Sequence, residues 1–88
     1  MSGVYLLHFD SPFGHARHYT GFAEDIEARI TKHRKGNGSR LMSAVKAAGI
    51  GFTVARIWPG ADRHFERRLK NWHGASRYCP ICKQRKDE

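Results

Sequence analysis

Residues 3–9 form a run of apolar and aromatic side chains, Gly-Val-Tyr-Leu-Leu-His-Phe, without an Asp, Glu, Lys or Arg. Such a run is typical of a buried β-strand. Residues 10–14, Asp-Ser-Pro-Phe-Gly, then predict a turn-rich loop. Residues 17–22 predict a second strand that pairs with the first as a hairpin.

Helical and strand patterns follow the hairpin. Residues 23–35 predict a helix, because acidic residues come first and basic residues last, as the helix dipole favours. After a glycine-rich link, Ser39 predicts the N-cap of a helix over about 40–48. Residues 52–58 predict a third strand. Its two expected faces are Phe52, Val54 and Arg56 against Thr53, Ala55 and Ile57.

Asp62 predicts the N-cap of a third helix that runs to about residue 73. The order β-β-α-α-β-α predicts an α+β (mixed α/β) domain, in which helices flank a small three-stranded sheet. Eighty-eight residues can bury one modest core. We assign residues 1–74 to this domain and residues 75–88 to a basic C-terminal tail.

The charge of the chain is one-sided. Its formal net charge is +8, and from Arg29 to Lys86 it carries fifteen Lys or Arg against two acids, Asp62 and Glu66. A basic surface of this kind suits a phosphate backbone, where counterion release supplies much of the affinity. We therefore expect a polyanionic partner with a phosphate backbone.

The N-terminus lacks a basic flank followed by a long apolar run, which argues against a secretory signal. No stretch approaches the roughly 18 apolar residues of a membrane span. No predicted helix sets a broad apolar face opposite a basic one, so we expect no membrane partner. These features predict a cytoplasmic protein associated with DNA or the nucleoid.

Cys79-Pro-Ile-Cys82 is the one cysteine motif. Two cysteines are too few for a disulfide scaffold, and their spacing suits a metal ion or a redox pair. The motif resembles half of a Zn²⁺ site, which needs four ligands. His64 and His73 are the candidate partners, and the expected form is a knuckle that holds the tail against the third helix.

Two tyrosines stand beside glycines on the predicted hairpin, in Gly3-Val4-Tyr5 and Tyr19-Thr20-Gly21. Arg29 and His33 are four residues apart and therefore share one side of the following helix. Glu66 stands among arginines on the third helix. Two phenols, a guanidinium, an imidazole and a carboxylate are a plausible set for cutting a phosphodiester with a metal ion.

These motifs resemble those of the GIY-YIG nuclease domain. The first tripeptide has Val for Ile and the second has Thr for Ile. Between Gly21 and His33, the Asp25-Ile26 and Arg29-Ile30 pairs are similar to the family's Gly…Asp-Leu…Arg-Leu…His run. The resemblance covers about residues 3–72.

The resemblance implies a metal-dependent DNA endonuclease that hydrolyses phosphodiesters by a one-metal mechanism. It implies a catalytic set of Tyr5, Tyr19, Arg29, His33 and Glu66. Glu66 would hold Mg²⁺ or Mn²⁺, and the remaining oxygen ligands would come from phosphate and water. Tyr5 would orient or deprotonate the attacking water, with Arg29 and the metal lowering its pKa. Tyr19 would orient groups, and Arg29 would steady the transition-state charge.

Each of these residues also has a structural interpretation. Glu66 could form an exposed i,i+4 ion pair with Lys70, and Arg29 could pair with Asp25. His33 could donate to phosphate, relay a proton or lie on the surface at a helix end. The tyrosines could be ordinary strand residues. The family's asparagine after the glutamate has no assigned equivalent here, because Asn71 follows Glu66 by only five residues.

Six basic residues are expected to grip the DNA backbone, with solubilising surface as the alternative. They are Lys32, Arg34, Lys35, Arg40, Arg63 and Arg67. Two other functions stay open from the sequence. One is a non-catalytic nucleic-acid-binding module of the same fold, and the other is a zinc-tail adaptor whose main partner is a protein.

Overall fold

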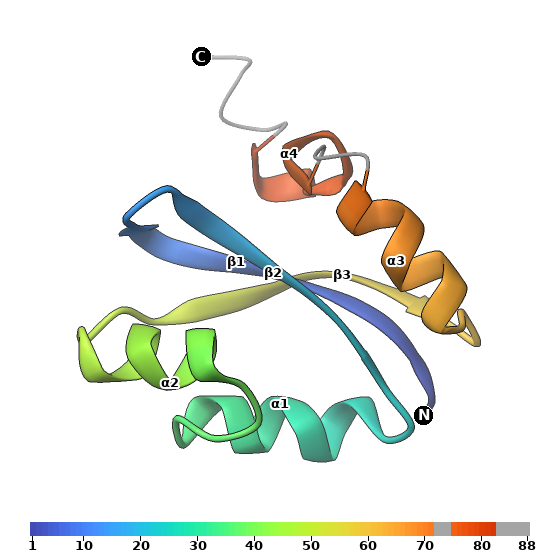
Figure 1. Ribbon diagram of the computed structural model, residues 1–88, viewed down its shortest axis with the longest axis horizontal. Helices are drawn as coiled ribbons and strands as arrows, with labels where there is room; N and C mark the ends of the chain where they lie inside the picture. Colours follow the sequence, from blue (N-terminus) through green and yellow to red (C-terminus); the bar gives the residue numbers. More distant parts are fainter. Residues whose placement is uncertain (72–74, 83–88) are drawn as a thin grey trace.

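The computed structural model describes residues 1–71 and 75–82. Figure 1 shows the arrangement of its elements. In chain order they are β1 (Gly3–Phe13), β2 (Ala16–Ala23), α1 (Ile26–Arg34), α2 (Arg40–Ala47), β3 (Phe52–Pro59), α3 (Arg63–Asn71) and α4 (Ala75–Tyr78). The predicted α+β class and the order β-β-α-α-β-α are confirmed, and a short helix follows. Within the described ranges, no helix is long and apolar enough to cross a bilayer.

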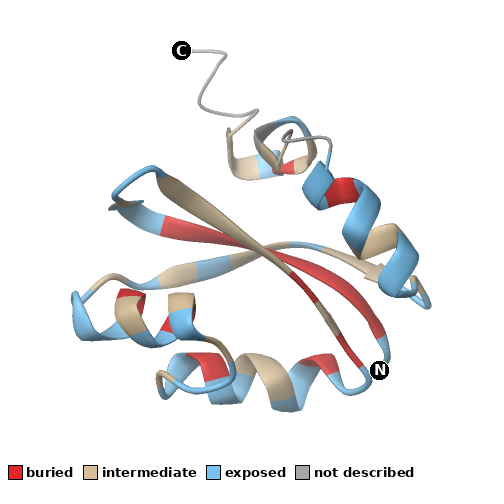
Figure 2. Cartoon of the chain, in the orientation of Figure 1, coloured by how far each residue is buried: buried red, intermediate tan, exposed pale blue. Residues whose placement is uncertain are grey.

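Strand β1 is the centre of the molecule. The three strands form one antiparallel sheet in the order β2-β1-β3. Tyr5 on β1 lies opposite Gly21 on β2 and opposite Ile57 on β3. Residues 3–9 are all buried, as Figure 2 shows in red. The apolar run at the start of the chain therefore fits a strand that has a neighbour along both edges.

Helices cover both faces of the sheet: α1 and α2 lie on one side, and α3 and α4 on the other (Figure 1). Side chains alternate between the faces of a strand. The buried cluster of the α1–α2 face consists of Tyr5, Leu7, Phe9, Ala23, Ile26, Met42 and Val45. On the other face, the Trp58 ring contacts Phe65 of α3 and Tyr78 of α4, with centroid separations of 5.6 and 6.4 Å.

Side-chain caps begin the first three helices. Asp25, Ser39 and Asp62 each accept a hydrogen bond from the backbone N–H three residues later, at 3.2, 3.0 and 2.9 Å. These bonds satisfy amide groups that the first turn of a helix leaves without partners. The predicted caps at Ser39 and Asp62 are confirmed. Helix α1 begins at Ile26, later than predicted, because β2 continues to Ala23.

The hairpin is longer than predicted. Residues 10–13 belong to β1, and only Gly14 and His15 separate it from β2. Phe13 and Ala16 form the last cross-strand pair and pack against the core cluster, so burial carries the strands past the expected loop. The pairing of β1 with β3 ends at Phe9, which leaves Pro12 outside a fully paired ladder.

Strand β3 carries an irregularity that changes its predicted faces. Its register against β1 shifts between Leu6 and Leu7, which pair with Arg56 and Val54 and so pass over Ala55. One extra residue in a strand reverses the alternation beyond it. Ile57 therefore joins Phe52 and Val54 against the core, whereas the sequence pattern placed it on the opposite face.

The first prediction tests the central strand. Leu7→Ala removes a fully buried side chain of the core cluster, so we expect the free energy of unfolding to fall by about 2–5 kcal/mol. Urea unfolding measures this change. Ser43→Ala, at an exposed position of α2, is the control and should shift stability by no more than about 0.5 kcal/mol. A loss below about 1 kcal/mol for Leu7→Ala would contradict the packing described.

Candidate functional site

Tyr5 and His33 form a buried hydrogen-bonded pair, termed here the Tyr5–His33 dyad. Tyr5 comes from β1 and His33 from the last turn of α1, and they are 0% and 1% exposed. His33 Nδ1 lies 3.0 Å from the carbonyl oxygen of Asn37. A carbonyl only accepts, so Nδ1 carries the proton and donates. His33 Nε2 therefore accepts the hydrogen bond from the Tyr5 hydroxyl, at 2.7 Å.

Both members of the dyad are uncharged at neutral pH: Tyr5 keeps its hydroxyl proton, and His33 carries a single proton, on Nδ1. Burial lowers the pKa of His33, and the charge of Arg29 lowers it further, while the bond to Asn37 acts in the opposite direction. Burial also raises the pKa of Tyr5 well above its ordinary value, and Tyr19 and Glu66 add to this rise. Arg29 opposes it but does not outweigh burial. Arg29 therefore lowers the Tyr5 pKa as expected, but the net shift is upward because burial is the larger effect.

Gly21 makes room for both phenols. It lies opposite Tyr5 in the β1–β2 register, and a Cβ there would meet the Tyr5 hydroxyl oxygen at 2.5 Å and Tyr19 Cε2 at 2.9 Å. The Tyr5 and Tyr19 rings are 6.1 Å apart by centroid, and Tyr19 lies edge-on to His33 at 5.3 Å. Both tyrosines therefore converge on one imidazole.

Gly38 holds the other side of the dyad. Its φ is +95°, a conformation that favours glycine, and it lies in the link between α1 and α2. A Cβ there would meet His33 ring atoms at 3.0 Å and Arg29 Cδ at 3.4 Å. The glycine-rich link thus ends α1 and also lets its backbone pack against two predicted site residues.

Glu66 approaches this group from α3. Its charge adds to the rise in the Tyr5 pKa. Lys70 connects α3 with β2, because its Nζ lies 3.3 Å from Glu66 Oε2 and 5.9 Å from the Tyr19 ring centroid. The predicted i,i+4 ion pair is therefore present. It is the sole ion pair among residues 1–71 and 75–82, so Arg29 and Asp25 do not form one.

Hollows follow the outer edge of β2, between α1 and α3, and we term this series the β2-edge groove. The first, of about 370 Å³, is lined by Arg29, Lys32 and Arg63 among others. The second, of about 600 Å³, is lined by Arg63, His64, Glu66, Arg67, Lys70 and Asn71. The third, of about 470 Å³, contains Tyr19 and Lys70. Neighbouring hollows share lining residues: Arg63 lines the first and second, and Lys70 lines the second and third.

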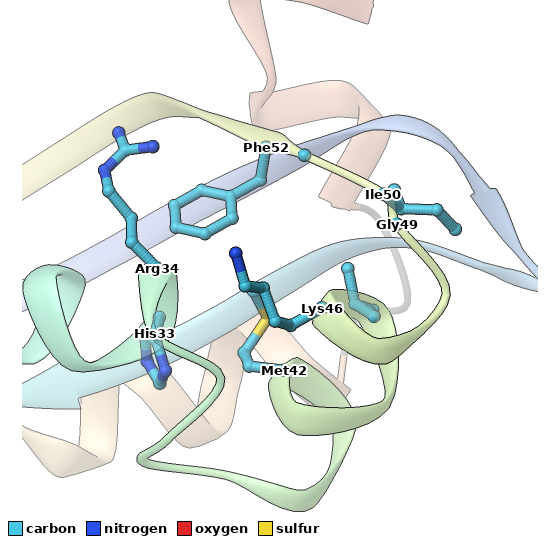
Figure 3. Close-up of a pocket in the computed structure, with 9 residues that line it drawn as sticks. His33, Arg34, Met42, Lys46, Gly49, Ile50 and Phe52 are labelled. Carbon is cyan, nitrogen blue, oxygen red and sulfur yellow. The ribbon is translucent and has the colours of Figure 1, made fainter.

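The other predicted DNA contacts lie elsewhere. Arg34 lies over the Phe52 ring, at 4.7 Å, in a pocket of about 370 Å³ between α1, α2 and the start of β3 (Figure 3). Lys35 is the C-cap residue of α1, and Arg40 is the exposed first residue of α2. None of the described lining residues of this pocket is acidic, so it offers no carboxylate to a divalent cation. The β2-edge groove is the better candidate site.

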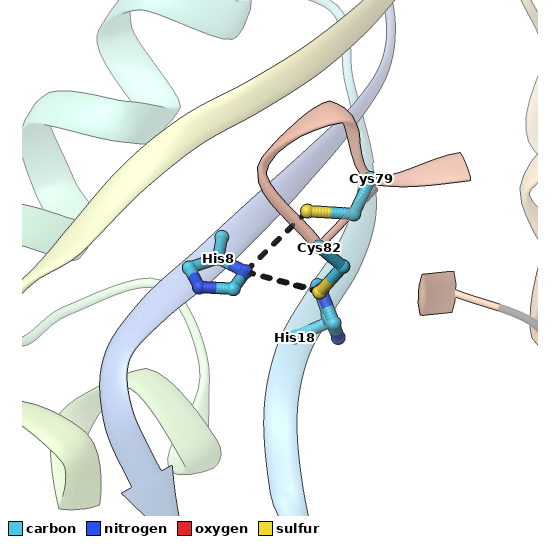
Figure 4. Close-up of side chains that lie close together, drawn as sticks. All are labelled: His8, His18, Cys79 and Cys82. Carbon is cyan, nitrogen blue, oxygen red and sulfur yellow. Dashed lines mark hydrogen bonds between the residues drawn. The ribbon is translucent and has the colours of Figure 1, made fainter. Parts of the chain in front are cut away.

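A second cluster of chemical interest lies on the opposite face of the sheet. His8 and His18 form a cross-strand pair of β1 and β2, and Cys79 and Cys82 approach them from the C-terminal segment (Figure 4). Their donor atoms all lie within 4.8 Å of one another. This His₂Cys₂ cluster could hold a metal ion such as Zn²⁺.

The histidine partners of the cysteines differ from those expected. His64 lies on α3 beside Glu66, and His73 is outside the described residues. His8 had no predicted role, and His18 was unassigned, because their proximity depends on the hairpin register. Burial, together with the smaller effects of His8 and Arg17, lowers the pKa of His18 to about 4, so its imidazole is neutral at physiological pH.

Comparison of the chain with protein-family models, with curated proteins and with solved structures found no match. The structure brings Tyr5, Tyr19, Arg29 and His33 together at the edge of the hairpin and leaves Glu66 at its margin. Lys32, Arg63 and Arg67 line the same groove, whereas Arg34, Lys35 and Arg40 have other locations.

The second prediction concerns pH. Because the pKa of His33 is lower in the folded state than in the unfolded chain, the unfolded state binds more protons and stability falls as pH drops below about 6.5. His33→Gln keeps an acceptor for Tyr5 but removes this titration. Urea unfolding between pH 7.5 and 5 should therefore show a smaller loss of stability in the variant than in the wild type. Parallel losses would assign the pH dependence to other groups, such as His18.

Proposed function

We propose that this chain is a GIY-YIG-type endonuclease that hydrolyses DNA phosphodiester bonds with one divalent metal ion. The observation that carries the proposal is the contact of Tyr5, Tyr19 and His33 at one edge of the sheet, with Arg29 and Glu66 acting electrostatically on the same phenol. These five residues are the set that the sequence motifs predicted. They come from four different elements, β1, β2, α1 and α3.

The dyad offers a route for the proton of the attacking water. Tyr5 holds its own proton at neutral pH, so it is a poor base alone. Its hydroxyl donates to the neutral Nε2 of His33. Tyr5 is 0% exposed, so the attacking water first has to gain access to its oxygen. As that water transfers a proton to the Tyr5 oxygen, the Tyr5 proton passes to Nε2, and the resulting imidazolium still donates to Asn37. In this scheme His33 is the terminal base and Tyr5 is the relay.

Arg29 and Glu66 serve the phosphate. The Arg29 guanidinium offers a planar fork of donors that suits phosphoryl oxygens. The Glu66 side chain is 18% exposed and provides the hard oxygen ligand that Mg²⁺ or Mn²⁺ prefers. A divalent cation there supplies Lewis-acid polarisation of the phosphate. Lys70 compensates the Glu66 charge in the free protein and is exposed enough, at 53%, to move aside.

The β2-edge groove suits the DNA backbone. Lys32, Arg63 and Arg67 line it on both sides of the predicted metal ligand. Because phosphate contacts position a duplex without reading its sequence, these side chains explain backbone binding. They do not by themselves select a DNA sequence.

The third prediction tests the chemistry. Glu66→Gln removes the charged metal ligand and should reduce plasmid nicking in Mg²⁺ or Mn²⁺ by about 100-fold or more, since metal polarisation contributes several kcal/mol. Circular dichroism and DNA affinity should change little. Glu27→Gln, at an exposed position in the first turn of α1, is the matched control and should retain nicking.

The outcomes separate the alternatives. Equal nicking by wild type and Glu66→Gln rejects the metal assignment. Salt-sensitive binding by the wild type, with no cleavage of duplex, branched or single-stranded DNA, favours a non-catalytic binding module. Absence of salt-dependent DNA affinity together with bound zinc favours the protein adaptor.

The fourth prediction tests the groove. In the Glu66→Gln background, Lys32→Ala and Arg67→Ala should each weaken DNA binding by a few-fold and reduce the slope of log affinity against log salt by about 1. Lys46→Ala removes an exposed cation from the pocket of Figure 3 instead and is the control. Fluorescence anisotropy across a salt series measures the slopes. A larger effect of Lys46→Ala would move the interface to that pocket.

A further inference from the structure

The His₂Cys₂ cluster has the chemistry of a closed structural metal site. It combines two imidazole nitrogens with two sulfurs, a donor set typical of structural zinc. His8 is 3% exposed and Cys79 is fully buried. Neither cysteine is joined in a disulfide. His18 and Cys82 are half-buried. A site with four protein ligands has no open position for a substrate, which points to a structural role.

Four of the six donor–donor distances in the cluster match the edges of a zinc tetrahedron. Bond lengths of about 2.05 Å to nitrogen and 2.3 Å to sulfur give edges of about 3.3 Å between nitrogens and about 3.6 Å between nitrogen and sulfur. His8 Nδ1 and His18 Nε2 are 3.3 Å apart. His8 Nδ1 lies 3.4 Å from Cys79 Sγ and 3.6 Å from Cys82 Sγ, and His18 Nε2 lies 3.3 Å from Cys82 Sγ.

The backbone holds these ligands in place from two directions. His8 and His18 are the last regular cross-strand pair before the β1–β2 register shifts. The cysteines lie directly after α4, whose Tyr78 ring contacts Trp58 of β3. A metal ion here would tie together segments more than sixty residues apart in the sequence, 8–18 and 79–82.

We propose that His8, His18, Cys79 and Cys82 bind one zinc ion that fastens the C-terminal segment, residues 75–82, to the β1–β2 hairpin. The ion stabilises the fold because a domain of this size buries a modest core, and a structural metal adds folding energy that the core lacks. Its four ligands take no part in the proposed DNA cleavage, so the two proposals stand or fall separately.

The fifth prediction measures the metal. Protein purified under reducing conditions with zinc in the medium should contain about one zinc per chain by elemental analysis. Replacing zinc with Co²⁺ should give the visible bands of tetrahedral cobalt and thiolate charge-transfer bands. His18→Ala and Cys82→Ser should lose the bound metal. His15→Ala, at an exposed position of the hairpin turn, should keep it.

Hydrogen exchange tests the fastening role on the wild-type protein and does not depend on whether the variants fold. Removal of zinc with a chelator should increase exchange in residues 75–82 and lower the unfolding temperature, while α1 and α2 keep their protection. Re-addition of Zn²⁺ should restore both.

Three results would overturn the proposal. One is wild-type protein with neither zinc nor cobalt bands after loading. Another is a Cys79–Cys82 disulfide, found by mass spectrometry, in protein kept under reducing conditions. The third is full zinc content in the folded His18→Ala variant, which would place the ligands elsewhere. Unchanged exchange in residues 75–82 after metal removal would overturn the fastening role.

Discussion

The burial of strand β1 on both faces is the constraint on which the rest of the structure depends. Side chains alternate along a strand, so the central strand contributes buried side chains to both faces of the sheet. Tyr5 belongs to the core cluster beside α1 and α2, and His8 faces the C-terminal cysteines. One strand thus contributes to two chemically different sites, separated by the thickness of the sheet. Strand β2 repeats the pattern, because His18 and Tyr19 are adjacent in the sequence.

Buried polar groups make the first of these sites specific. A hydroxyl and an imidazole inside a small core destabilise the fold unless each finds a partner, because an unsatisfied buried group costs about 1–3 kcal/mol. The Tyr5–His33 dyad meets this requirement, and the Asn37 carbonyl completes the chain of hydrogen bonds. The same bonds fix the His33 tautomer. The hydrogen bonds that satisfy these buried polar groups are therefore the same bonds that form the proposed proton route.

Charge organises the surface around the dyad. Glu66 is an acid among cations, and Lys70 neutralises it while lying beside the Tyr19 ring. The β2-edge groove presents Lys32, Arg63 and Arg67 to a polyanion, and its first hollow also contains the acids Glu24 and Asp25. The Glu66–Lys70 ion pair is compatible with the proposed role of Glu66 as a metal ligand. A cation bound at Glu66 would replace the Lys70 ammonium at the carboxylate.

The sequence by itself determined the sheet and the helices, because alternation, capping and glycine placement are local signals. The residues that converge at the hairpin edge were implied by the resemblance to the GIY-YIG motifs. The sequence could not determine the β3 faces, since a one-residue bulge at Ala55 appears only when strands pair. It likewise missed His8 as a partner of the cysteines. Metal ligands are recognised by convergence, and only the tertiary structure decides which histidines a CxxC motif meets. The net rise in the Tyr5 pKa was hidden for a similar reason: burial, which outweighs Arg29, is a property of the folded chain.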